Sequence, residues 1–246
     1  MLIAPILLSL ASALPLSAGQ EPTAERVEAA VAELQSAFKD GDAAARIAAL
    51  KASVDAVDAR VVGLVAAGLK DKERSVALVA CDSLGRMRHP DSIKALKSFY
   101  AGEKKKLGKD EEGLVAVLAS IGRLGDPKGI DVLVDSPFKS TGYPVVQARF
   151  LGLANIRSTE SVEALFGLLN KVGNLDQDRY MTDIRLALVQ LTGEDRGSDP
   201  RQWQAWWQEN KKGYQIPAEA KELPIEMRLR WNAFWGIEEQ PSETGR

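Results

Sequence analysis

The chain has almost no histidine or cysteine: its 246 residues include only His89 and Cys81. One residue of each type cannot form the usual four-ligand zinc sites. No base or ligand pattern surrounds His89, so we expect it to serve in a turn or a helix cap. One cysteine also excludes an internal disulfide framework. Cys81 lies in an apolar helical stretch, which favours a buried small side chain, so stability must come from apolar burial.

Neither sign of charge is in excess, and aromatic residues are few. Lys and Arg total 32 against 34 Asp and Glu, a formal net charge of −2, which does not predict a nucleic-acid interface. The sequence lacks a phosphate-binding glycine motif placed after a strand. The acidic turn at 193–199 lacks the ligand spacing of a calcium-binding EF-hand loop. We therefore expect no enzyme activity, no cofactor, no bound metal and no nucleic-acid partner.

The one long apolar run of the sequence is at its N-terminus. No charged side chain precedes Glu21, and the run from Leu2 to Leu16 ends in small residues, as in a secretory signal peptide. The run is short for a membrane span and contains two prolines. The sequence thus predicts a signal peptide over 1–19, atypical in having no Lys or Arg before the apolar run. It predicts a secreted or periplasmic protein with no stable membrane span after cleavage; an uncleaved anchor or a buried helix stays open.

Three segments of the chain repeat one pattern. Ser83–Phe99 aligns with Ser120–Ser136 at an offset of 37 residues, and Gly152–Leu168 follows 32 residues later. Each has an apolar helix, a small residue that we interpret as the turn, a polar residue before Pro or Thr, and a second amphipathic helix. The polar residue, such as Asp126 before Pro127, suits a helix N-cap. Two short helices cannot bury both apolar faces alone, so neighbouring units must stack.

This pattern resembles the HEAT-repeat family, especially the short bacterial HEAT-like repeats also found in phycobilin lyases. The resemblance is carried by ALVACDSLGRMRHPDSIKALKSF, AVLASIGRLGDPKGIDVL and RFLGLANIRSTESVEALFGLL. It implies an all-α, right-handed α-solenoid of about four to five helix pairs, closed by Trp-rich capping helices. Such arrays are mostly binding scaffolds, which implies a non-catalytic protein that mediates protein–protein interaction outside the cytoplasm. The alternatives are a ligand-binding or lyase-like HEAT protein, or a carbohydrate binder that uses the C-terminal tryptophans.

Apolar residues recur at helical spacing almost throughout, and no stretch alternates as a strand does. We expect a HEAT-like repeat domain over 20–213, a C-terminal extension with an amphipathic helix over 214–237, and a disordered tail over 238–246. The predicted helices are 23–38, 42–52, 57–70, 73–87, 91–107, 110–124, 127–134, 144–156, 159–171, 178–192, 200–212 and 224–235.

Three of the five tryptophans fall within five residues. Trp203, Trp206 and Trp207 share one face of the helix that begins at Pro200, and the repeat alignment places this face inward. Gly193 is suited to end the preceding helix, and Asp199 with Gln202 forms a capping-box sequence. Because three exposed tryptophans would forgo a large burial energy, we predict that they form the structural core of a closing unit.

A second aromatic stripe lies near the C-terminus, where Met227, Trp231, Phe234 and Trp235 share one face of a short helix. This helix either folds back on the repeats or stays exposed to dock a partner. Separately, one repeat position is occupied by Arg86, Arg123 and Asn155. These three residues could form a polar ladder that binds a partner, or could cap the carbonyls of the preceding helix. The candidate partner-binding residues are Arg86, Arg123, Asn155, Arg157, Trp231, Phe234 and Trp235.

Overall fold

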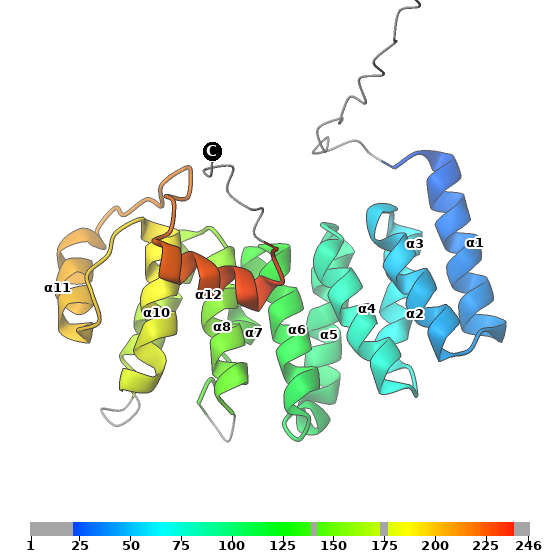
Figure 1. Ribbon diagram of the computed structural model, residues 1–246, viewed down its shortest axis with the longest axis horizontal. Helices are drawn as coiled ribbons and strands as arrows, with labels where there is room; N and C mark the ends of the chain where they lie inside the picture. The colour runs from blue at the N-terminus through cyan, green and yellow to red at the C-terminus, as the bar shows by residue number, and fades with distance from the viewer. Residues whose placement is uncertain (1–21, 139–141, 173–176, 239–246) are drawn as a thin grey trace, which may run out of the picture.

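The computed structural model describes residues 22–138, 142–172 and 177–238, and within these it is all helical, with no strand (Figure 1). The predicted signal peptide and nearly all of the predicted tail lie outside the described residues. The helices are α1 (Ala24–Asp40), α2 (Ala43–Ala52), α3 (Ala59–Ala67), α4 (Arg74–Arg86), α5 (Pro90–Leu107), α6 (Glu111–Leu124), α7 (Ile130–Leu133), α8 (Tyr143–Asn155), α9 (Thr159–Leu169), α10 (Gln177–Thr192), α11 (Pro200–Asn210) and α12 (Ile225–Trp235).

The predicted helices are confirmed to within a few residues. The main differences are local: the helix predicted over 57–70 ends at Ala67 and continues as a 3-10 turn over Gly68–Lys70, and the one predicted over 127–134 begins as a 3-10 turn over Pro127–Gly129. Tighter 3-10 turns are frequent at helix ends, so these changes do not alter the order of elements.

The helices lie side by side in two layers along the longest axis of the molecule (Figure 1). In the layer nearer the viewer, which we call the front layer, α2, α4, α6, α8 and α10 contact one another in chain order. Behind it, α3 contacts α5, and α7 contacts α9. Consecutive helices therefore alternate between the layers, and the apolar core lies between them.

One position of the repeat is a helix N-cap in four successive units. Asp126 accepts a hydrogen bond from the backbone N–H of Lys128 at 2.9 Å, and His89 Nδ1 accepts from that of Asp91 at 3.1 Å. Ser158 and Asp199 do the same for α9 and α11. These contacts confirm the cap roles predicted for the repeat, although Asp199 accepts from Arg201, one residue earlier than a capping box requires.

The repeated glycines lie inside helices, within the predicted ranges 73–87 and 110–124. Gly85 and Gly122 lie inside α4 and α6, where neighbouring front-layer helices cross. A Cβ on Gly122 would lie 2.3 Å from Cα of Gly152 in α8, and one on Gly85 would lie 2.8 Å from Cα of Ser120 in α6. Their lack of a side chain permits the close approach of neighbouring helices, while the predicted turn after 110–124 is made by Gly125, which ends α6 in the left-handed conformation at φ 68°.

The tryptophans of α11 close the C-terminal end of the two layers. Trp203 is fully buried and donates from Nε1 to the carbonyl of Gly197 at 2.8 Å, and Trp206 and Trp207 are also buried. The Trp207 ring stacks on Phe166 of α9 with centroids 4.8 Å apart. Tyr214, just beyond α11, packs edge-on against Trp206 and Trp207. The core role predicted for the three tryptophans is confirmed.

After α11 the chain turns back, and α12 crosses in front of α10 and α8 and ends over α6 (Figure 1). Met227, Trp231 and Phe234 pack against the core, and Trp235 is buried. Of the two alternatives left open for this helix, the structure shows the folded-back one. No helix in the described part of the chain is both long and apolar enough to span a membrane.

Candidate functional site

Three of the candidate partner-binding residues meet at the end of α12. Arg86 of α4 places Nε 2.8 Å from Oδ2 of Asp82, and Arg123 of α6 donates to Oδ1 of the same carboxylate. The Arg123 guanidinium also lies 5.4 Å from the centroid of the Trp235 ring. The repeated arginines and the aromatic stripe of α12, which are more than 100 residues apart in the sequence, thus form one cluster. We call Arg86 and Arg123 the arginine pair.

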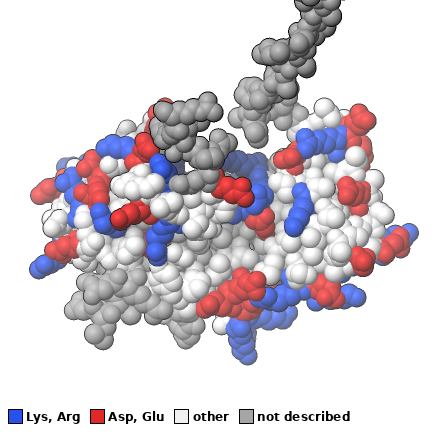
Figure 2. All heavy atoms as spheres, viewed as in Figure 1, with Lys and Arg blue, Asp and Glu red and all other residues white. Residues whose placement is uncertain are grey.

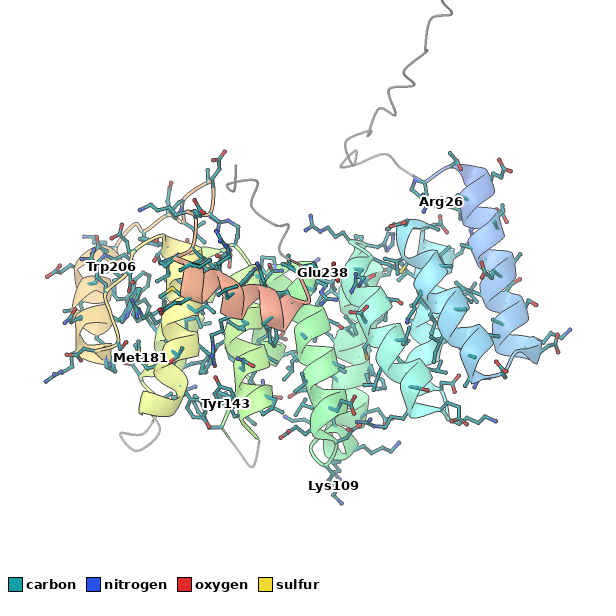
Figure 3. All side chains as sticks on the ribbon, in the orientation of Figure 1. Arg26, Lys109, Tyr143, Met181, Trp206 and Glu238 are labelled. Carbon is teal, nitrogen blue, oxygen red and sulfur yellow. The ribbon has the colours of Figure 1, made fainter. Side chains whose placement is uncertain are left out.

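The arginine pair is open to solvent, and its two positive charges face a single carboxylate. The side chain of Arg86 is 54% exposed and that of Arg123 is 25% exposed. Two guanidinium groups share the one carboxylate of Asp82, so one positive charge is not neutralised within the cluster. Glu238 lies at the same end of α12 (Figure 3). Exposed ion pairs contribute at most about 1 kcal/mol to stability, so rearranging this cluster costs little.

Asn155 and Arg157 have a different role. Asn155 donates from Nδ2 to the carbonyls of Gly122 and Arg123 at 3.0 and 3.3 Å. Arg157 donates to the carbonyls of Gln190 and Pro217 at 3.2 and 2.5 Å. Asn155 therefore caps the end of α6, which is the alternative role considered for the ladder, and Arg157 ties the C-terminal extension to α10. The predicted ladder is brought together only at Arg86 and Arg123.

A buried polar cluster, which we call the α12 anchor, holds α12 to the front layer. Asp183 of α10 has 0% of its side chain exposed and accepts from Arg230 Nε at 2.6 Å and from Gln147 Nε2 at 3.2 Å. Tyr143 of α8 donates its hydroxyl proton to the other oxygen of Asp183, and Arg230 Nη2 donates to the Tyr143 hydroxyl. An ionised carboxylate is buried only when it is paired and hydrogen-bonded, and here α12 supplies the cation.

The contacts of the α12 anchor raise the pKa values of Tyr143 and Arg230. Burial, followed by the hydrogen bond to Asp183, raises the pKa of Tyr143 to about 12. The hydrogen bond to Asp183 raises the pKa of Arg230, despite its partial burial. Sequence reasoning missed this cluster. The signal was Asp183, a charged residue at helical spacing from the apolar Tyr180 and Ala187, which has to find a partner when that face is buried.

The outward side of α12 and the chain just beyond its C-terminal end carry apolar side chains that have no cover in the described structure. Ile225, Leu229 and Ile237 are 54%, 49% and 51% exposed and are the exposed large apolar side chains of the described residues. Ala233 is exposed between them. We call these four residues the outer stripe. Their spacing of four residues was legible in the sequence, but the interpretation followed the aromatic residues on the opposite side of the helix.

The inward side of α12 is imperfectly packed. Met227, Trp231 and Phe234 are only partly buried, and the buried Nε1 of Trp235 has no hydrogen-bond partner among the described residues. A buried donor without an acceptor costs about 1–3 kcal/mol. Docking of α12 therefore depends strongly on the α12 anchor.

A cavity of about 370 Å³ lies between α10 and α12. Its cations are already paired, because Arg185 binds Asp195 and Arg230 binds Asp183. Among the described residues there is no group of three His, Cys, Asp or Glu side chains placed to hold a metal ion. On the face drawn in Figure 2, acidic and basic side chains are intermixed, with no broad field of one sign.

The single cysteine directly precedes Asp82, the carboxylate that the arginine pair shares. Cys81 is buried and unpaired, as predicted, and burial raises the pKa of its thiol to about 12, with the negative charge of Asp82 adding to the effect. The thiolate is the reactive form, so this side chain is inert at neutral pH.

No family model matches the chain, and no curated protein matches it. The class of protein is therefore defined by the described architecture alone: an all-helical chain in which neighbouring helices pack on one another.

Proposed function

We propose that the two layers form a right-handed, HEAT-like α-solenoid of five helix pairs, α2/α3 to α10/α11, preceded by α1 and crossed by α12. Three observations support this: the alternation of helices between layers, the N-cap repeated at His89, Asp126 and Ser158, and the small residues at successive front-layer crossings. Each unit buries its apolar faces only against its neighbours, as in repeat proteins.

We further propose that this solenoid is a non-catalytic scaffold that binds a protein partner outside the cytoplasm. The observation that carries the proposal is the convergence of Arg86, Arg123 and Trp235 at a solvent-open edge of the front layer. Arginine is one of the side chains that most often dominate binding energy at protein interfaces, and the Arg86 side chain is 54% exposed. Export rests on the apolar N-terminal run, whose residues 1–19 precede the described structure.

The proposal is tested by affinity capture from an extracytoplasmic fraction, with Arg86→Glu compared with the unchanged chain. We expect the substitution to remove a specific set of captured proteins, because it reverses a charge at the exposed edge of the arginine pair. Arg201→Glu is the matched control, since Arg201 is an 86% exposed arginine on α11 that also pairs with one aspartate. Identical capture by all three chains would contradict the proposal.

The cavity between α10 and α12 favours the alternative of a ligand-binding HEAT protein. Its volume of about 370 Å³ falls within the range of small-molecule sites, about 300–1,000 Å³. Thr182 lines it and is exposed, so Thr182→Trp fills the cavity without changing the core. A small molecule that co-purifies with the chain and is lost in this variant would favour ligand carriage over scaffolding.

A further inference from the structure

The part of the front layer that α12 covers, which we call the α12 groove, presents a specific set of polar groups. At its centre is the fully buried carboxylate of Asp183, with the Tyr143 hydroxyl and the Gln147 amide beside it. At its end the Arg123 guanidinium offers its face to an aromatic ring. An occupant of this groove must supply a cation to the carboxylate and an aromatic side chain to the arginine.

The resident occupant, α12, fits this groove only in part. It satisfies the carboxylate through Arg230, but it leaves the buried Nε1 of Trp235 without an acceptor and three large apolar side chains of the outer stripe in water. A helix that is apolar on two opposite faces is normally covered on both. A helix with the same inner face and a polar outer face would bind here without that cost.

The segment that carries α12 is built so that the helix can leave while the solenoid stays closed. The aromatic core of Trp203, Trp206 and Trp207 belongs to α11 and is complete before the chain reaches α12. Residues 211–224 connect α11 to α12, and most of them are exposed. They contact the body through single hydrogen bonds from Arg157 to Pro217 and from Lys221 to Gly193, and through the side chains of Tyr214 and Leu223.

We propose that α12 is an exchangeable, autoinhibitory occupant, and that the groove over α8 and α10 binds an amphipathic helix of a partner protein. That helix presents one arginine to Asp183 and an aromatic residue about one turn later to Arg123, in the manner of Arg230 and Trp235. The inference rests on the proposed function in taking the partner to be a protein. It adds where the partner binds, which side chains the partner presents, and how α12 regulates the binding.

The test uses the full chain with Arg230→Gln, which removes the cation of the α12 anchor, and Arg228→Gln as the matched control. Arg228 lies two residues away and forms an exposed ion pair with Glu222. Hydrogen exchange over 225–235 is expected to rise at least tenfold in Arg230→Gln only, with the exchange of α6 and α8 unchanged. Unchanged exchange over 225–235 in Arg230→Gln would overturn the proposal, because the anchor would then not hold α12.

Occupancy is measured with a fluorescent peptide of residues 222–238 added in trans. We expect saturable binding to the Arg230→Gln chain and at least tenfold weaker binding to the unchanged chain, whose own α12 competes at a high effective concentration. The same peptide carrying Arg230→Gln is expected to bind at least tenfold more weakly. Equal binding of the two peptides, or no binding to the released chain, would overturn the proposal. All chains in this test keep Arg86, so capture of partners that depends on Arg86 can succeed even when the peptide result fails. The two failures are therefore distinguishable.

Discussion

Arg230 of α12 places its Nε 2.6 Å from Oδ1 of Asp183, a carboxylate on α10 that is closed to solvent. The two residues are 47 positions apart, and their contact is the one ion pair among those described in which a side chain is completely buried. This contact decides both where α12 lies and how much of the front layer it covers.

Arg230→Ala is expected to lower the free energy of unfolding by about 2 kcal/mol. Removing one partner of a fully buried pair costs about 3–5 kcal/mol, and the loss is smaller here because Arg230 is 35% exposed, so water reaches the site. Urea unfolding followed by circular dichroism measures the change. Arg228→Ala, which breaks the exposed pair with Glu222, should change stability by less than about 0.5 kcal/mol; an equal loss in both variants would contradict the role of Asp183.

Gly122→Ala is expected to be strongly destabilising, by at least about 2 kcal/mol, because overpacking forces backbone shifts. The added methyl would lie 2.3 Å from Cα of Gly152, a backbone atom that cannot move without shifting α8. Gly63→Ala is the matched control, since Gly63 lies inside α3 with nothing within 4 Å of an added Cβ. It should stabilise the chain by about 0.5–1 kcal/mol. Thermal unfolding of the two variants should therefore shift in opposite directions.

The helices of this chain could be predicted from sequence because their signals are local. Asp126 before Pro127 marks a helix start within two residues, and the inward face of Trp203 and Trp206 follows from their spacing and from the repeat. The role of Gly122 could not be predicted in the same way, because it depends on a backbone atom of Gly152, 30 residues further along. A glycine near a helix end has the same sequence signature whether it forms a turn or a crossing.

The candidate site was predictable in its members but not in its arrangement. Arg86 and Arg123 were selected by their shared repeat position and Trp235 by its aromatic stripe, yet no local pattern indicated that all three meet. Asn155 was selected by the same repeat position, but its short side chain reaches the carbonyls of α6 instead. Asp183 and Arg230 were not selected, because pairing between distant elements leaves no periodic signal.

Stability is expected to fall between pH 9 and about 12 in a way that depends on Cys81. Burial raises the pKa of the thiol from 9.0 to about 12, so between these values the unfolded chain loses a proton that the native chain keeps. A group with a raised pKa contributes stability that is complete below the unfolded pKa and is lost as the pH rises. At about pH 10.5 the loss from this group is about 2 kcal/mol.

Cys81→Ala should remove this component of the pH dependence. The variant is less stable at pH 8 because it loses buried volume, but its free energy of unfolding should fall less on going to about pH 10.5 than that of the unchanged chain. Buried tyrosines titrate equally in both chains, so the difference isolates the thiol. Parallel pH profiles would show that Cys81 is not held neutral by burial.

Iodide quenching of tryptophan fluorescence should separate α11 from α12. Trp203, Trp206 and Trp207 are buried beneath Phe166 and Tyr214, so an anion that stays in water should not reach them. Trp231 is only partly buried, and Trp231→Phe should remove most of the fluorescence that iodide can quench. Trp203→Phe should lower the total emission without changing the amount that iodide quenches, so the quenchable fraction should rise.

The same measurement tests a carbohydrate-binding role for these residues. A sugar ring binds by covering an accessible aromatic face, so a glycan can protect only tryptophans that iodide already reaches. If iodide quenched the α11 tryptophans and a glycan restored their emission, the closing role of α11 would be wrong. If quenching were confined to Trp231 and rose sharply in Arg230→Gln, the outcome would connect exposure of the α12 aromatic residues directly to the buried carboxylate of Asp183, because that substitution changes no aromatic side chain.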